Sequence, residues 1–140
     1  MIRLSHIEKS YCLGSEAVQA LSDISLHVRP GEFVSIVGPS GSGKSTLMNI
    51  LGLLDIPDSG AYYLDGQEVS TLSDNGLAAL RNQKIGFVFQ NFNLLSKLSA
   101  LETVKLPLSL RGIRQKEMTA SAHDYLQRVG LGGRERHIPS

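Results

Sequence analysis

The apolar and polar positions at the start of the chain predict extended strands. Residues 2–11 place apolar side chains at close to every second position, and residues 18–28 repeat this partial alternation after a turn at Gly14-Ser15. Period-two alternation is typical of strands that are buried on one face only. We therefore expect two strands joined by a tight turn.

Two later runs are almost wholly apolar. They are residues 33–37, which glycines follow at once, and residues 85–89, which end at Gln90. Short, β-rich apolar runs of this kind are typical of parallel strands buried on both faces. The pattern predicts that both runs are core strands of a parallel sheet.

Between these runs, residues 44–52 place apolar residues on one side of a helix, which Gly52 and then Pro57 would end. Residues 60–64 resemble an edge strand. Asp65-Gly66 predicts a hairpin turn into a short second strand. Residues 77–81 carry a short helical signal.

The chain after Gln90 has a helical pattern. Ser99 and Glu102 have the spacing of a capping box, and Pro107 is expected to kink or end the helix that follows. Residues 115–129 form a further predicted helix with its apolar residues on one face. The whole pattern predicts an α/β chain that is rich in strands first and helical last.

Composition adds little to this picture. The 140 residues carry 14 Lys and Arg against 13 Asp and Glu, with 41% hydrophobic residues, which is ordinary for one globular domain. A net charge of +1 offers no basic surface for nucleic acid or for an anionic membrane. The single Cys12 excludes an internal disulfide, and the scattered histidines show no metal-binding spacing.

A glycine-rich segment between the first apolar run and the first predicted helix matches the pattern G-x-x-x-x-G-K-[ST]. It consists of Gly38, Pro39, Ser40, Gly41, Ser42, Gly43, Lys44, Ser45 and Thr46. Glycines let backbone amides wrap a polyphosphate closely, and the following helix adds free N–H groups and the positive end of its dipole. Lys44 is expected to contact the β- and γ-phosphates, and Ser45 is expected to bind Mg²⁺.

The alternative to a nucleotide-binding loop is an ordinary glycine-serine turn that precedes Lys-Ser by chance. The strand, loop and helix order around the segment favours a nucleotide-binding loop instead. The loop alone does not identify the class of protein, because GTPases, small-molecule kinases, motors and transporter ATPases all share it.

Three features follow one another in the chain: Tyr11, the phosphate loop, and an apolar run that ends in Gln90 and precedes a helical segment. In this order the chain resembles the ATP-binding subunits of ATP-binding-cassette (ABC) transporters over all 140 residues. The resemblance implies that Tyr11 stacks on adenine and that residues 87–95 are the Q-loop, in which Gln90 contacts Mg²⁺ and the attacking water. Apart from the resemblance, an ordinary strand tyrosine stays an open alternative for Tyr11, and a surface-loop glutamine is the favoured interpretation of Gln90.

The resemblance is closest to the branch that contains lipoprotein-releasing ATPases and macrolide exporters, through residues 48–55, 80–87 and 94–104. It implies ATP and Mg²⁺ as cofactors and a head-to-tail dimer with a second ATP-binding subunit. A membrane-spanning transporter subunit is expected to contact residues 90–110. The subunit would then lie in the cytoplasm, on the inner face of the cell membrane.

The fold implied is an α/β P-loop NTPase core with an N-terminal antiparallel β subdomain and the start of a helical subdomain. Residues 1–90 would form the core and the β subdomain, and residues 91–140 the Q-loop and an incomplete helical subdomain. The core sheet is expected to be incomplete.

Three motifs of the family do not occur among these residues: the Leu-Ser-Gly-Gly-Gln signature, an apolar strand ending in Asp-Glu, and a switch histidine. Asp65 ends a partly similar run, but Gly66 stands where the catalytic glutamate would be, so Asp65 reads as a hairpin residue. We therefore expect the 140 residues to bind Mg-ATP without hydrolysing it, and to leave strand edges unpaired.

Several functions remain open at this point. The chain could represent the ATPase subunit of a membrane transporter, or a truncated remnant that binds nucleotide without hydrolysis. It could also belong to a cassette ATPase of cell division, repair or translation. A small-molecule kinase leaves Tyr11 and the Gln90 segment unexplained.

Overall fold

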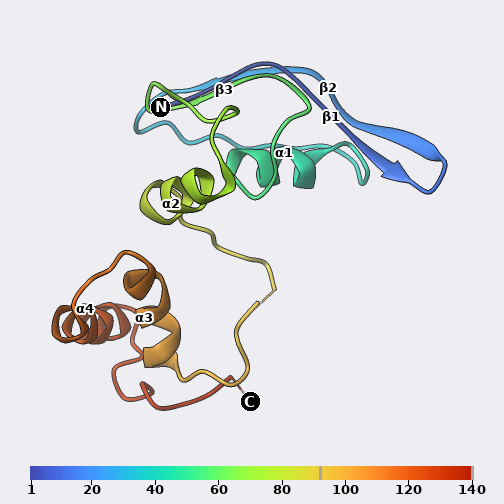
Figure 1. Cartoon of the computed structure of the whole chain (residues 1–140). Helices are drawn as coiled ribbons and strands as arrows, with labels where there is room; N and C mark the ends of the chain where they lie inside the picture. Colours follow the sequence, from blue (N-terminus) through green and yellow to red (C-terminus); the bar gives the residue numbers. More distant parts are fainter. Residues whose placement is uncertain (92, 140) are drawn as a thin grey trace. The chain divides into compact units, whose positions relative to one another are not determined.

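The computed structural model describes residues 1–91 and 93–139; Phe92, inside the predicted Q-loop, and Ser140 lie outside the described residues. The chain divides into two compact units, Met1–Arg81 and Asn82–Ser140, which we describe separately (Figure 1). The division into residues 1–90 and 91–140 stays a prediction.

The first unit is built on an antiparallel sheet. Its strands are β1 (Ile2–Leu13), β2 (Glu16–Val28), β3 (Ser59–Leu64) and β4 (Gln67–Glu68), in the spatial order β2-β1-β3-β4. The predicted strand pair, its turn and the later hairpin are therefore confirmed. The expectation of an edge strand at residues 60–64 is wrong, because β3 pairs with β1 on one side and with β4 on the other.

Two helices accompany this sheet, α1 (Lys44–Leu51) and α2 (Asp74–Lys84). In Figure 1, α1 runs along one face of the sheet, and it contacts β2. The phenol of the buried Tyr62 on β3 donates a hydrogen bond of 2.8 Å to the carbonyl of Leu51, at the end of α1. Burial raises the pKa of Tyr62 to about 12, so the phenol keeps its proton and holds sheet and helix together. The core side chains of this unit are Leu4, Ile7, Leu21, Ile50, Leu53, Tyr62, Leu64, Val69 and Leu77.

The prediction of core strands at residues 33–37 and 85–89 is wrong for this structure. Neither run belongs to a strand, and Phe33 is 94% exposed while Val88 is fully exposed. A strand exists only as part of a hydrogen-bonded ladder, and the single sheet of the described chain contains β1 to β4 alone. The two apolar runs have no partner strand there, which agrees with the expectation that the core sheet is incomplete.

The second unit contains α3 (Ala100–Leu110) and α4 (Gln115–Arg128), which pack against each other (Figure 1). Pro107 lies inside α3 and does not end it. Both helices contribute buried side chains, namely Leu108, Met118, Ala122 and Leu126. Tyr125 and Val129, which the helical pattern placed on the apolar face, are 48% and 69% exposed. None of the described residues covers this part of the apolar face of α4.

The segment after α4 folds back onto the start of α3. The amides of Ala100 and Leu101 donate 2.9 Å hydrogen bonds to the carbonyls of His137 and Glu135. The Oε1 of the same Glu135 is hydrogen-bonded to the Nδ1 of His123 on α4, at 2.5 Å. Residues 134–139 therefore tie the two helices together. None of the helices in residues 1–91 and 93–139 combines the length and apolarity that crossing a membrane requires.

The predicted capping box at Ser99 is confirmed: the Ser99 Oγ accepts a hydrogen bond from the Glu102 amide, and the Ser99 amide donates to the Glu102 carboxylate at 2.8 Å. These bonds satisfy amides at the start of α3 that otherwise have no partner within the helix. The hydroxyl and amide of Ser99 also lower the pKa of Glu102 from its ordinary value. A carboxylate with a lowered pKa stabilises the helix above pH 4.5, and this stabilisation is lost as the pH falls through the lowered pKa.

We predict that Ser99→Ala lowers the free energy of unfolding of α3 by about 1 kcal/mol, since it removes the capping oxygen. The pKa of Glu102 should rise toward its ordinary value in the same variant. Amide hydrogen exchange over the first turn of α3 and a carboxyl NMR titration measure these two effects. Ser109→Ala, an exposed serine within the same helix, is the control and should change both quantities little; equal effects of the two variants would contradict the capping role.

Candidate phosphate-binding site

The glycine-rich loop leads directly into α1. Gly41 and Gly43 have φ angles of +81° and +84°, and Gly43 is the N-cap residue of α1. No side chain caps the helix, and its first turn holds no acidic residue. The first amides of a helix have no partner within it, so α1 presents unsatisfied donors and the positive end of its dipole at the loop. This arrangement suits an anion.

The loop forms a pocket of about 490 Å³ with β2. Ser40 to Thr46 line one side, and Val18, Gln19 and Ala20 of β2 line the other. The predicted loop residues therefore come together, whereas the sequence patterns did not point to the three β2 residues as part of the site. The close approach of Gly43 to Ala20 brings residues 18–20 next to residues 40–46.

Gly43 is the point of closest approach between loop and sheet. A Cβ atom at Gly43 would lie 2.4 Å from the carbonyl oxygen of Ala20 and 2.9 Å from the Cδ2 of Leu21. Gly41 has a similar φ angle but open space around it. Two separate constraints thus select glycine at position 43: the left-handed backbone and the contact with β2.

Lys44 folds back over its own loop. Its Nζ donates hydrogen bonds of 2.5 Å to the carbonyl of Pro39 and 3.2 Å to the Oγ of Ser42. A phosphate oxygen would accept a stronger, charge-assisted bond from the same ammonium. The lysine is therefore held at the loop in a position from which it can turn to a bound phosphate.

Ser45 lies exposed in the first turn of α1. Mg²⁺ in phosphate sites usually takes one or two protein oxygens and completes its octahedron with waters and phosphate oxygens, so one hydroxyl beside the loop fits this ion. Within residues 1–91 and 93–139 no group of three or more His, Cys, Asp or Glu residues is arranged to hold a metal without a phosphate.

Tyr11 lies at the edge of the same pocket. It is paired with Val18 in the β1–β2 register, and paired residues of an antiparallel sheet share one face. Its phenol donates a 2.7 Å hydrogen bond to the Oδ2 of Asp55 and lies near the Thr46 hydroxyl. The bond to Asp55, with partial burial, raises the pKa of Tyr11 above its ordinary value.

Asp55 and Lys9 were not predicted as part of this site. Lys9 Nζ donates to Asp55 Oδ1 at 2.9 Å and to the Ile56 carbonyl at 2.8 Å. Burial alone would lower the pKa of Lys9, but hydrogen bonds with Asp55 and Asp58 outweigh it and raise the pKa. Burial likewise opposes ionisation of Asp55, but hydrogen bonds from Tyr11 and Lys9 lower its pKa. Because 46 residues separate Lys9 from Asp55 in the chain, no local sequence pattern could have joined them.

Gln90 belongs to the second unit and is exposed at a bend in the chain. Just before it, the rings of Phe87 and Phe89 stack with centroids 5.5 Å apart. The predicted contact of Gln90 with Mg²⁺ and the attacking water stays a prediction.

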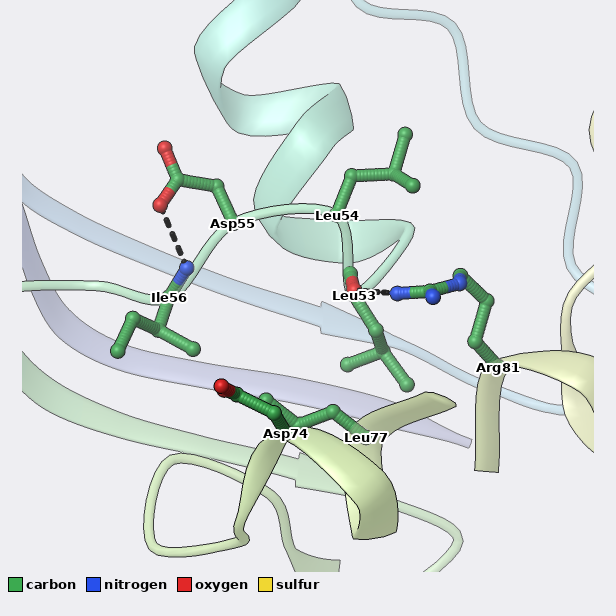
Figure 2. Close-up of a pocket in the computed structure, with 7 residues that line it drawn as sticks. All are labelled: Leu53, Leu54, Asp55, Ile56, Asp74, Leu77 and Arg81. Atoms are coloured by element: carbon green, nitrogen blue, oxygen red, sulfur yellow. Dashed lines mark hydrogen bonds between the residues drawn. The ribbon is translucent and has the colours of Figure 1, made fainter. Parts of the chain in front are cut away.

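A second pocket of the first unit, of about 320 Å³, lies between the chain after α1 and the start of α2 (Figure 2). It is lined by Leu53, Leu54, Asp55, Ile56, Asp74, Leu77 and Arg81. One guanidinium nitrogen of Arg81 donates to the Leu53 carbonyl at 2.6 Å, and the Ile56 amide donates to Asp55 at 2.8 Å (Figure 2). These bonds fix the turn that carries Asp55 toward Tyr11.

Comparison with known proteins places these observations in a family. The family model described as ABC transporter matches residues 21–140. The uncharacterized ABC transporter ATP-binding protein YknY of Bacillus subtilis (strain 168) is 51% identical over 140 residues, which are 100% of this chain and 61% of that protein. The macrolide export ATP-binding/permease protein MacB of Salmonella typhimurium (strain LT2) is 49% identical over the same 140 residues, which are 22% of its length.

A solved structure, the dimeric post-hydrolysis state of the ATP-binding cassette MJ0796 bound to ADP and Pi, is 43% identical and superposes with a TM-score of 0.89. The match covers 99% of this chain and 62% of that one. The chain thus spans about three fifths of the length of YknY and of MJ0796.

We predict that Gly43→Ala lowers the free energy of unfolding by about 2 kcal/mol or more, because it adds a clash with Ala20 to the strain of a left-handed backbone. Gly41→Ala has a similar φ angle and open surroundings, so it should cost only about 1 kcal/mol. Urea denaturation of the two variants and of the unchanged chain measures the difference. Equal losses would mean that β2 does not constrain the loop.

Proposed function

Because the chain belongs to the ABC transporter family, we propose that it forms part of an ATP-binding subunit that powers a membrane transporter through binding and hydrolysis of Mg-ATP. The observation that carries this proposal is the phosphate-loop pocket: an uncapped helix N-terminus, two left-handed glycines and Lys44 converge on one cavity beside β2. The expected P-loop fold with an antiparallel β subdomain is confirmed by the match to MJ0796.

In this proposal the loop residues Gly38 to Thr46 bind the polyphosphate, and Lys44 contacts the β- and γ-phosphates. Mg²⁺ supplies charge neutralisation between the β- and γ-phosphates when it is bound, and Ser45 and Gln90 are the residues that would hold it. Tyr11 stacks on the adenine ring. The orientation of Tyr11 at the pocket edge supports this last role.

The proposed partners are a second ATP-binding subunit and a membrane-spanning subunit. The dimeric state of MJ0796 supports the first, and the names of YknY and MacB as transporter components support the second. The membrane subunit would contact residues 90–110 and hold the cassette at the cytoplasmic face. An efflux system of the MacB and YknY type is the transporter we favour, over a cassette of cell division, repair or translation, because the similar proteins named above are transport proteins.

We further propose that the 140 residues alone bind Mg-ATP without turning it over. Water attack on the γ-phosphate needs a group that orients the nucleophile, and the sequence contains no apolar strand ending in Asp-Glu and no signature motif. Asp65, which follows the run most similar to such a strand, lies in the β3–β4 hairpin with a φ angle of +51°.

We predict that Lys44→Ala weakens binding of a fluorescent ATP analogue by about ten- to a hundredfold, since one charge-assisted contact to phosphate is lost. Omitting Mg²⁺ should also weaken binding to the unchanged chain. Lys97→Ala removes the same charge from an exposed position of the second unit and should leave affinity unchanged. Unaltered binding in the Lys44 variant would refute the site.

We predict no phosphate release above background when the purified chain is incubated with Mg-ATP at concentrations that saturate binding. A coupled assay for inorganic phosphate measures this directly. Release that disappears in the Lys44→Ala variant would show that these residues hydrolyse ATP after all.

A further inference from the structure

We propose that Asp55, backed by Lys9, is a positioning residue for Tyr11: it fixes the phenol ring at the rim of the phosphate-loop pocket and so sets affinity for the base of the nucleotide rather than for its phosphates. This inference rests on the function proposed above, and it adds two residues to which the sequence patterns gave no role, Asp55 and Lys9. Both act through Tyr11 and not on the phosphates.

The carboxylate of Asp55 is fully engaged. Its Oδ2 accepts the phenol hydrogen of Tyr11 at 2.7 Å, while its Oδ1 accepts from Lys9 Nζ at 2.9 Å and from the Ile56 amide at 2.8 Å. The bond to Ile56 orients the carboxylate on its own turn, as Figure 2 shows. Since each oxygen has a defined donor, the carboxylate cannot rotate without breaking a bond, and it offers Tyr11 a fixed acceptor.

Lys9 anchors this acceptor to β1. The Lys9 side chain is only 10% exposed, and a charge so far removed from water is stable only when it is paired. Besides Asp55, it contacts Asp58 Oδ1 at 3.3 Å and the Ile56 carbonyl at 2.8 Å. Asp58 is itself held to β1, because its Oδ2 accepts from the Ser10 amide at 2.7 Å. The turn after α1 is therefore attached to the strand that carries Tyr11.

Tyr11 needs such an anchor because packing alone does not immobilise its ring. It lies near the end of β1 on a half-exposed site, close to irregularities of the β1–β2 register between Lys9 and Ser10. The ammonium of Lys9 stands over one face of the ring, 5.3 Å from its centroid, and in this proposal a planar base stacks on the opposite face. With the phenol oxygen bound to Asp55, the ring keeps one orientation beside Val18, its partner in the β1–β2 register and a residue that lines the pocket.

The energetic consequence is preorganisation. A ring that is already oriented loses little side-chain entropy when a base stacks on it, whereas a ring that rotates freely must be ordered at the moment of binding. In the proposed function the phosphates bind to the loop and to Lys44, whose ammonium donates to Pro39 and Ser42 and not to Asp55. Loss of the Asp55 contact should therefore weaken binding of ATP and leave binding of inorganic tripolyphosphate unchanged.

The experiment compares these two ligands in the presence of Mg²⁺ by calorimetry on the full chain. We expect Tyr11→Phe and Asp55→Asn each to weaken ATP binding by about three- to tenfold, the range of one hydrogen bond, with unchanged affinity for tripolyphosphate. The double variant should bind ATP no more weakly than either single variant, because Tyr11→Phe removes the donor and Asp55→Asn the charged acceptor of the same bond. This non-additivity separates positioning from a merely structural role.

Two matched controls accompany these variants. Asp58→Asn makes the same change of charge in the same cluster, but Asp58 contacts Lys9 and Ser10 instead of Tyr11; it should preserve the ratio of the two affinities. Tyr63→Phe removes a phenol oxygen from β3 and should also preserve that ratio.

Equal weakening of both ligands by Asp55→Asn, or a further loss in the double variant, would overturn the inference. Should Asp55→Asn fail to fold, Tyr11→Phe carries the test, since it keeps the ring and deletes the hydroxyl that donates to Asp55. If neither ligand binds the unchanged chain, the proposed function fails. If both bind and depend on Lys44 while Tyr11→Phe leaves ATP affinity unchanged, only the positioning role fails.

Discussion

The approach of Gly43 to the carbonyl of Ala20 is the contact on which the site depends. No other residue than glycine leaves room for β2 at this point, because a Cβ atom would lie 2.4 Å from the Ala20 oxygen. The contact brings residues 18–20 against the loop and turns an exposed bend into a pocket. It also aligns the start of α1, with its uncapped amides, along the same cavity. The shape of this candidate phosphate site is a consequence of backbone packing.

A second constraint joins the two ends of α1 to the sheet. The N-terminus of α1 meets β2 at Gly43, while the segment after its C-terminus is held by Tyr62 and by the cluster of Lys9 and Asp55. Each of these contacts links a strand to an end of α1 or to the residues that flank it. Tyr11 and the glycine-rich loop are thus both held beside the same helix by contacts with the sheet.

Features that depend on neighbouring residues could be predicted from the sequence, whereas strands that need a distant partner could not. Local signals sufficed for the β1–β2 turn, the start of α1 after Gly43, and the capping box at Ser99, because each depends on neighbours within a few residues. Residues 33–37 and 85–89 carry an equally clear strand signal and yet belong to no strand. A strand needs a partner, and apolar composition alone does not supply one.

By itself, the sequence determined where the glycine-rich loop lies, since the pattern from Gly38 to Thr46 encodes a backbone conformation and a charge within one short segment. Tertiary structure alone decided the remaining wall of the pocket, residues 18–20, and the pairing of Lys9 with Asp55 across 46 positions. The physical reason is the sequence separation of the interacting residues. Glycine conformation and helix capping depend on residues that are neighbours in the chain. Burial of a charge beside its partner depends on how distant segments pack.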